Sequence, residues 1–212
     1  MSDIMFFFTA NMPGSVFSQL FDESQTAENA VPFLTLIRTP DQQEVDEWGT
    51  EPPIDDFETG FLGKTDDELR CFFRQFLAER PPSSQGNIGG HWMAVLDELS
   101  AAQSTIVLHY GMKKPDWDEI YQYEPEKTIP GTGKVCEDGY IWWKWRVPFK
   151  HSYHFYMTIE HCDIEVMEMF CRPEYVDSDG VVDCDTCYKI LYREIRDPLG
   201  LVGGEWEVPS DA

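Results

Sequence analysis

Basic residues are scarce in this sequence. Of its 212 residues, 16 are Lys or Arg and 39 are Asp or Glu, which gives a formal net charge of −23. Proteins that bind nucleic acids or anionic membranes need clustered Lys and Arg, because those partners carry phosphate groups. The composition therefore argues against nucleic acid and membrane as partners. It favours a basic protein, a polyamine or a divalent cation.

Long hydrophobic runs are also missing. No stretch approaches the roughly 18 consecutive apolar residues that a membrane-spanning helix needs. The first apolar run, residues 4–8, is short and follows Met1-Ser2-Asp3, which carries an acid where an export signal carries bases. We therefore expect a soluble protein of the cytoplasm or the nucleus. In such a compartment the six cysteines are free thiols or metal ligands rather than disulfides.

No complete catalytic or phosphate-binding motif is present. A GxSxG nucleophile elbow is absent, and residues 131–134 (GTGK) lack a phosphate loop's remaining residues, because Thr128 and Val135 stand where Gly and Ser or Thr are required. The acids around Gly180 do not fit a calcium loop, since Tyr175 would take its first ligand position. These mismatches favour a protein without catalytic activity.

Hydrophobic patterning predicts an α+β protein. Apolar runs and alternation indicate strands, and apolar residues at helical spacing indicate helices. The clearest helix runs from Asp66 to Glu79, where Thr65 and Glu68 form a capping-box pattern ahead of an apolar stripe. The other expected elements are helices near residues 16–21, 150–158 and 163–170, and strands near residues 4–8, 33–37, 92–96, 105–110 and 140–147.

These elements fit a single domain over residues 1–196, with a central mixed sheet of about five strands and helices packed on one or both faces. Two segments interrupt the pattern. Residues 41–58 form an acidic loop or insertion, and residues 112–139 form a long loop rich in Pro and Gly. Residues 197–212 are a tail whose Pro and Gly content is typical of disorder.

The strand at residues 140–147 has one wholly apolar face. The alternation predicts that this face lies in the core, and it consists of Ile141, Trp143, Trp145 and Val147. On the opposite face we expect Trp142 to pack at an edge, beside Lys144 and Arg146. An aromatic pocket near Trp142 or Tyr140 that binds a small molecule is therefore one functional alternative.

The acidity is concentrated in residues 41–58, which contain eight acids and no base. Trp48, Ile54 and Phe57 are the residues expected to anchor this loop to the core. Its exposed acids are the candidate contacts for a basic partner: Asp41, Glu44, Asp46, Glu47, Asp55 and Asp56. The leading functional prediction is a non-catalytic protein-interaction module with an acidic surface.

A metal or enzymatic site is the other alternative. Cys184 and Cys187 form a CxxC pair, the spacing at which two thiolates bind one zinc ion, and His161 and Cys171 are the nearest further ligands. A second CxxC or HxxxH pair, which would complete a structural zinc site, is absent. Two free thiols beside a hairpin turn explain the same pattern. A redox role is disfavoured because Asp183 and Asp185 would raise the thiol pKa.

Several segments, in this order, resemble an uncharacterised domain family of filamentous fungi and actinomycetes whose function is unknown. The matching segments are residues 34–39, 92–98, 105–110, 145–149, 162–170 and 179–181. The resemblance implies a compact domain of α/β type and a fungal-like origin. It brings no catalytic residues, and the acidic stretch 41–58 and the loop 112–139 depart from the family's compact pattern.

Overall fold

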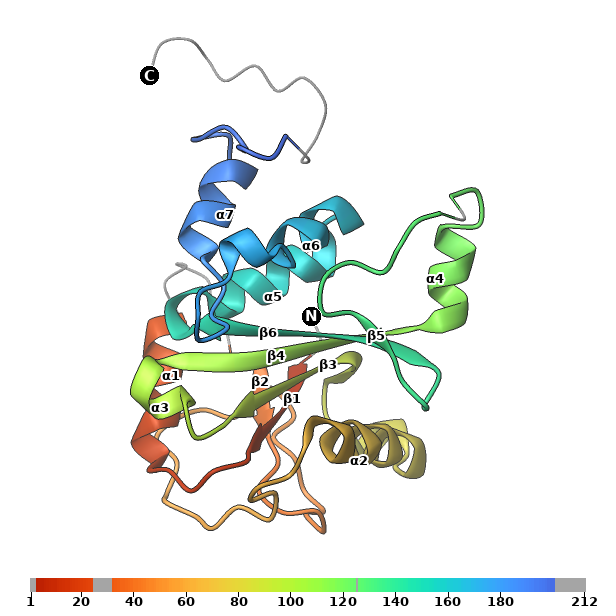
Figure 1. Cartoon of the computed structure of the whole chain (residues 1–212). Helices are drawn as coiled ribbons and strands as arrows, with labels where there is room; N and C mark the ends of the chain where they lie inside the picture. The colour runs from red at the N-terminus through yellow and green to blue at the C-terminus, as the bar shows by residue number, and fades with distance from the viewer. Residues whose placement is uncertain (1–2, 25–31, 125, 201–212) are drawn as a thin grey trace.

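Six strands form one mixed sheet in the computed structural model, which describes residues 3–24, 32–124 and 126–200 (Figure 1). The strand order is β2-β1-β3-β4-β6-β5. The first three strands in this order run parallel, and the remaining pairs are antiparallel. The strands are β1 (Asp3–Phe8), β2 (Leu34–Leu36), β3 (Ile88–Leu96), β4 (Thr105–Lys113), β5 (Lys134–Val135) and β6 (Tyr140–Pro148). The structure confirms the predicted α+β class and mixed sheet.

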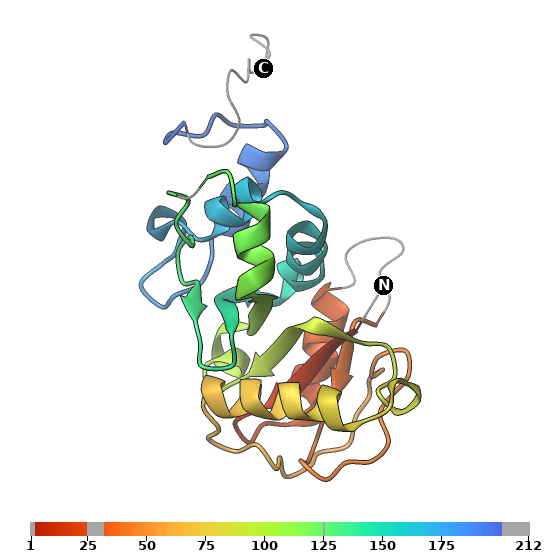
Figure 2. The same cartoon turned by 90° about the vertical axis from the view of Figure 1, so that its right-hand side faces the viewer.

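Helices cover both faces of the sheet (Figures 1 and 2). Strand β1 lies between β2 and β3, so the two crossovers that contain α1 and α2 run in opposite directions. Because such crossovers share one hand, α1 and α2 lie on opposite faces. The helices are α1 (Gly14–Ser24), α2 (Asp66–Glu79), α3 (Ser100–Gln103), α4 (Lys114–Ile120), α5 (Ser152–His161), α6 (Ile164–Phe170) and α7 (Cys184–Leu191). Among the described residues no helix is long and apolar enough to cross a membrane.

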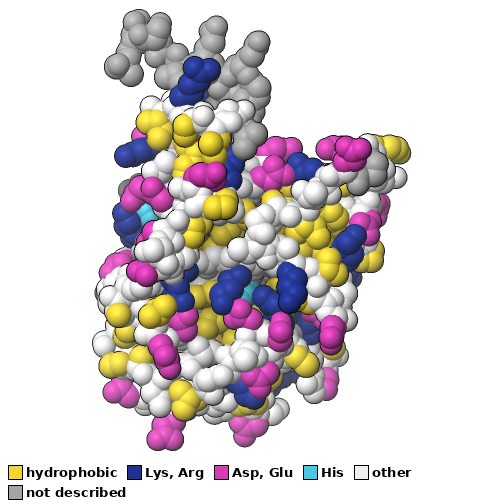
Figure 3. Space-filling view, in the orientation of Figure 1, with side chains coloured by type: hydrophobic (Ala, Val, Ile, Leu, Met, Phe, Trp, Pro, Cys, Tyr) yellow, Lys and Arg dark blue, Asp and Glu magenta, His cyan; other side chains and the backbone are white. Residues whose placement is uncertain are grey.

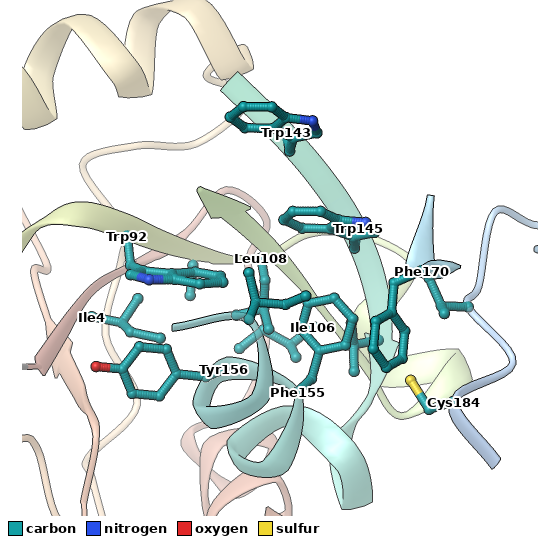
Figure 4. Close-up of a cluster of buried hydrophobic side chains, with 14 of the residues drawn as sticks. Ile4, Trp92, Ile106, Leu108, Trp143, Trp145, Phe155, Tyr156, Phe170 and Cys184 are labelled. Atoms are coloured by element: carbon teal, nitrogen blue, oxygen red, sulfur yellow. The ribbon is translucent and has the colours of Figure 1, made fainter. Parts of the chain in front are cut away.

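The strands are buried on both faces, which divides the core into two clusters. The larger cluster packs beneath α1 and α5 to α7, where the ring centroids of Trp145 and Phe155 are 5.3 Å apart and those of Trp92 and Tyr156 are also 5.3 Å apart (Figure 4). The smaller cluster packs beneath α2. The predicted apolar face of β6 is confirmed, since its four residues belong to the larger cluster: Ile141, Trp143, Trp145 and Val147.

The sequence pattern predicts that Trp142 packs at an edge, and this prediction is wrong. Only 1% of its surface is exposed, because α2 covers this part of the sheet. Its ring lies 6.0 Å from that of Phe73, and the Arg70 guanidinium stands over it at 5.5 Å. Tyr140 is also buried, beneath the guanidinium of Arg74. Both rings are therefore packed in the interior beneath α2, and the aromatic pocket near Trp142 or Tyr140 stays a prediction.

Helix α2 begins as predicted. The amide of Glu68 donates to Oγ1 of Thr65 at 3.3 Å, and the amide of Thr65 donates to Oε2 of Glu68 at 2.9 Å. This reciprocal capping box satisfies amides that the first helical turn cannot pair internally. Leu69, Phe73 and Phe76 then face the sheet as the expected apolar stripe.

Loops form hydrogen bonds with the sheet at the β2 edge and along β6. At β2, the amide of Thr50 donates to the carbonyl of Leu34 at 2.7 Å, and the amide of Leu36 donates to Oγ1 of Thr50 at 2.9 Å. At β6, beyond the short β5, Thr132 exchanges hydrogen bonds with the backbone of Lys144, and the amide of Val182 donates to the carbonyl of Arg146. Loop residues thus satisfy backbone hydrogen-bonding groups of β2 and β6 that have no partner strand.

Two predicted loop segments contain more structure than expected. Residues 112–139 include α4, which begins with Pro115 in its first turn and buries Trp117, and they include β5. At the start of the predicted tail, the carboxylate of Asp197 lies 2.9 Å from Nη1 of Arg172 and 3.2 Å from the Tyr175 hydroxyl. Asp197 therefore belongs to the packed structure, whereas residues 201–212 lie outside the described part.

Candidate functional site

The acidic loop, residues 41–58, has no helix or strand and is nevertheless held at several points. From the end of α2, Arg80 donates to the backbone carbonyls of Gln42 and Gln43, the second at 3.0 Å. Thr50 is hydrogen-bonded to β2, as described above. The backbone of the loop and the Thr50 side chain therefore supply these contacts.

The far end of the loop packs against the start of α1, close to the carboxyl end of β1. The chain leaves β1 towards one face and β2 towards the other, and the crevice between such strand ends is a common ligand site. Here Oδ1 of Asp56 accepts a hydrogen bond from the amide of Gly14 at the start of α1, at 2.7 Å. A Cβ atom on Gly14 would lie 2.4 Å from the carbonyl oxygen of Ile54. Residues 54–56 therefore pack against the start of α1, and the carboxylate of Asp56 is the acceptor for the Gly14 amide.

All eight acids of the loop are exposed. The six predicted contact residues, Asp41, Glu44, Asp46, Glu47, Asp55 and Asp56, are among them. Asp46 accepts a hydrogen bond from the Thr50 hydroxyl and Asp56 caps α1, while none of the eight forms an ion pair within the described ranges. In Figure 3, Asp and Glu side chains project around the lower part of the molecule, where Figure 1 places this loop.

Trp48 lies in the middle of the acidic loop with 72% of its surface exposed. The expectation that it anchors the loop is therefore wrong. Ile54 and Phe57 do pack against the larger core cluster, as expected. Sequence reasoning missed the exposure of Trp48. Val45, three residues before Trp48, packs against the smaller core cluster, so the spacing of apolar residues in the loop carried no signal that Trp48 projects into solvent.

The four predicted metal ligands are not brought together. His161 is exposed at the end of α5, Cys171 follows α6, and Cys184 and Cys187 are buried in the first turn of α7. Across the described segments no three His, Cys, Asp or Glu side chains are arranged to hold a metal ion. Cys184 and Cys187 are free thiols at the start of α7, directly after the turn at residues 177–180 that the antiparallel bridge between Val176 and Val182 closes, which agrees with the expectation of free thiols beside a hairpin turn.

The thiols of this region are also poor nucleophiles. Burial raises the pKa of Cys171 to about 11 and that of Cys187 to about 12, and it raises the pKa of Cys184 still further. A thiol reacts as its thiolate, which is scarce at neutral pH when the pKa is this high. The arrangement does not suit redox or nucleophilic chemistry.

A polar cluster joins α2 to the sheet, on the face opposite to the one that α5, α6 and α7 cover. Nδ1 of the buried His109 lies 3.5 Å from Nη2 of Arg70, and its Nε2 lies 3.5 Å from Oδ1 of Asp66. Because arginine nitrogens only donate, Nδ1 is the acceptor and Nε2 carries the proton that faces Asp66. Asp66 is also paired with Lys144, at 2.8 Å.

This cluster does not have the geometry of a catalytic dyad. In an Asp–His pair that performs proton transfer, the histidine faces the substrate and the carboxylate is buried. Here His109 is fully buried, whereas the side chain of Asp66 is 35% exposed. The cluster holds the first turn of α2 against β4 and β6.

Comparisons with known proteins identify no relative. No family model, curated protein or solved structure matches this chain. The resemblance to the uncharacterised fungal and actinobacterial domain family stays a prediction. The function has to be inferred from the surfaces themselves.

Proposed function

We propose that the protein is a non-catalytic interaction module whose acidic loop, residues 41–58, binds a basic protein. The observation that carries this proposal is the combination, on one anchored loop, of an exposed Trp48 and eight exposed acids that form no ion pair with any residue the structure describes. Unpaired carboxylates retain their full attraction for a cationic partner, since no internal cation competes for them. Trp48 supplies the apolar contact that such a surface otherwise lacks.

The anchoring of the loop favours binding. A loop that is already ordered loses little conformational entropy when a partner docks, so more of the contact energy appears as affinity. The hydrogen bonds from Arg80 and Thr50 provide this order without using the exposed carboxylates, apart from the one that Asp46 shares with Thr50. Surrounding acids accelerate encounter with a basic protein, and an exposed tryptophan is a frequent centre of an interface.

The test compares two variants with the same net charge. One carries Asp41→Asn, Glu44→Gln, Glu47→Gln and Asp55→Asn in the acidic loop. The matched control carries Glu98→Gln, Glu119→Gln, Glu126→Gln and Glu174→Gln, which replace exposed acids elsewhere. Binding of a decalysine peptide is measured by calorimetry at about 20 mM and about 150 mM salt, because exposed charge pairs weaken over this range.

We expect the loop variant to bind decalysine at least about tenfold more weakly than the control at the higher salt concentration. Trp48→Ala should weaken binding of a Lys- and Trp-containing decapeptide by roughly fivefold to tenfold, without changing thermal stability, because the side chain is mostly exposed. Equal losses in the two four-site variants would show that binding depends on total charge alone. That result would contradict a role for the loop.

A further inference from the structure

A row of aromatic side chains crosses the sheet between α5 and α4. Trp92 of β3, Tyr110 of β4 and Trp143 of β6 are direct neighbours in the strand register, with ring centroids 5.0 and 5.8 Å apart. Trp117 of α4 continues the row at 5.9 Å from Trp143, and Tyr121 packs on Trp117 at 4.4 Å. We call these five residues the aromatic row.

The aromatic row is not fully covered. Trp92, Trp117 and Trp143 are buried, but Tyr110 and Tyr121 are half-buried, and so is Met112, which lies two residues beyond Tyr110 on β4. Figure 2 looks onto the end of the sheet where α4 stands, and Figure 3 shows hydrophobic side chains at the surface beside this helix. The row therefore offers apolar surface to solvent at the level of the half-buried tyrosines.

Two carboxylates from different helices act electrostatically on Tyr110. Glu160, exposed at the end of α5, accepts a hydrogen bond from Nε1 of Trp92 at 2.6 Å, and Asp116 lies in the first turn of α4. Burial, together with the negative charges of Glu160 and then Asp116, raises the pKa of Tyr110 to about 12. Two acids from different helices thus act on one half-buried ring.

The other end of the aromatic row already holds an ammonium group. Nζ of Lys127 lies 5.7 Å over the ring of Tyr121 and 2.6 Å from Oε1 of Glu168. An aromatic face and a carboxylate together stabilise an ammonium ion, and they do so more strongly where water is partly excluded. At Tyr110 the same two kinds of group are present, but within the described residues neither Glu160 nor Asp116 forms an ion pair.

We propose that the half-buried aromatic surface at Tyr110, with the carboxylate of Glu160 on the adjoining Trp92 and with Asp116 contributing negative charge, binds a small organic ammonium ion. Its apolar substituents would pack on Tyr110 and Met112, and its charge would be balanced by the two carboxylates. An anion is excluded by those carboxylates. A bare metal ion needs several converging ligands, and the described residues provide no such group. The aromatic and apolar surface favours an alkylated amine of the choline type.

This site is separate from the acidic loop, which lies at the β2 edge and the start of α1. The aromatic row belongs to β3, β4, β6 and α4. Loss of binding at one place therefore leaves the other intact. The four-site loop variant described above should bind the ammonium ion as the unmodified protein does.

The experiment is a titration with choline chloride, followed by ¹H–¹⁵N nuclear magnetic resonance spectra, with sodium chloride adjusted to constant ionic strength. We expect saturable shifts of the Trp92 indole N–H and of the backbone amides of Tyr110 to Met112. Glu160→Gln and Asp116→Asn, which change exposed residues on two different helices, should each weaken binding roughly fivefold to tenfold. The control variant Glu174→Gln changes an exposed acid on a different element and should leave the affinity unchanged.

Several outcomes would overturn the proposal. One is the absence of saturable shifts up to about 50 mM choline, a range that covers weak recognition of a single charge. Another is shifts that spread over the whole acidic surface. A third is equal affinity for choline in Glu160→Gln and Glu174→Gln. Ethanolammonium binding as tightly as choline would still place a cation at the site, but it would contradict the role of the apolar substituents.

Discussion

Replacing the buried His109 should remove a large part of the protein's sensitivity to mild acid. Burial lowers the pKa of His109 to about 3, and the neighbouring Arg70 and Lys144 act in the same direction, while Asp66 opposes them. In the unfolded chain the pKa returns to about 6.5. The folded state therefore excludes a proton that the unfolded state binds below about pH 6.5.

The magnitude follows from this difference. The stability contributed by the neutral His109 is complete above the unfolded pKa. As the pH falls below that value, the free energy of unfolding decreases by about 1.4 kcal/mol for each pH unit until the folded pKa is reached. The exclusion of a proton from His109 alone should therefore lower the free energy of unfolding at pH 5 by about 2 kcal/mol relative to neutral pH. Burial also lowers the pKa values of His151 and His154, so these residues add losses of the same sign.

The assay is urea unfolding, followed by tryptophan fluorescence at pH 7.5 and pH 5.0. In His109→Gln, whose amide can accept from Arg70 and donate to Asp66, the loss between these pH values should be smaller than in the unmodified protein by about 2 kcal/mol. His161→Gln, at an exposed position at the end of α5, is the control and should keep the full loss. The reasoning is refuted if His109→Gln keeps the original pH dependence. It is also refuted if the His109 ring titrates near pH 6.5 in the folded protein.

Two further predictions concern α2 and the thiols. Thr65→Ala removes the reciprocal cap of α2 and should lower the free energy of unfolding by about 1 kcal/mol in urea titrations, whereas Thr65→Ser should keep most of it; no difference between the two variants would contradict this. Ellman's reagent should label the exposed Cys71 and Cys162 rapidly in the native protein, but the buried Cys184 and Cys187 only as fast as the protein unfolds. Rapid native labelling of the last two would mean that α7 does not shield them.

Elements whose signals are local could be predicted from the sequence. Helix α2 carries its cap and its apolar stripe within 14 residues, and β6 carries a strict alternation, so both were identified with nearly correct bounds. The order of the strands could not be predicted, because the pairing of β1 with both β2 and β3 depends on contacts between distant segments. Helix α4 was missed because Pro and Gly surround it, although Pro115 favours a first turn.

The candidate sites divide in the same way. The exposed acids of the acidic loop were predictable, because eight charges within 18 residues have no core to enter. The exposure of Trp48 was not, since an apolar loop residue packs or projects according to which partners the fold supplies. The aromatic row was also missed, because Trp92, Tyr110 and Trp143 come from three strands and meet only through their register.

The covering of β2 by Thr50 has a consequence for self-association. An open strand edge is a template on which other chains add and from which fibrous aggregates grow, and charged or occupied edges prevent this. Here one threonine satisfies a carbonyl and an amide of β2, and the same loop surrounds that edge with negative charge. The segment that we propose to attract a basic partner thus also protects the sheet against polymerisation. A partner that pulled this segment away would expose a strand edge with unpaired backbone hydrogen-bonding groups.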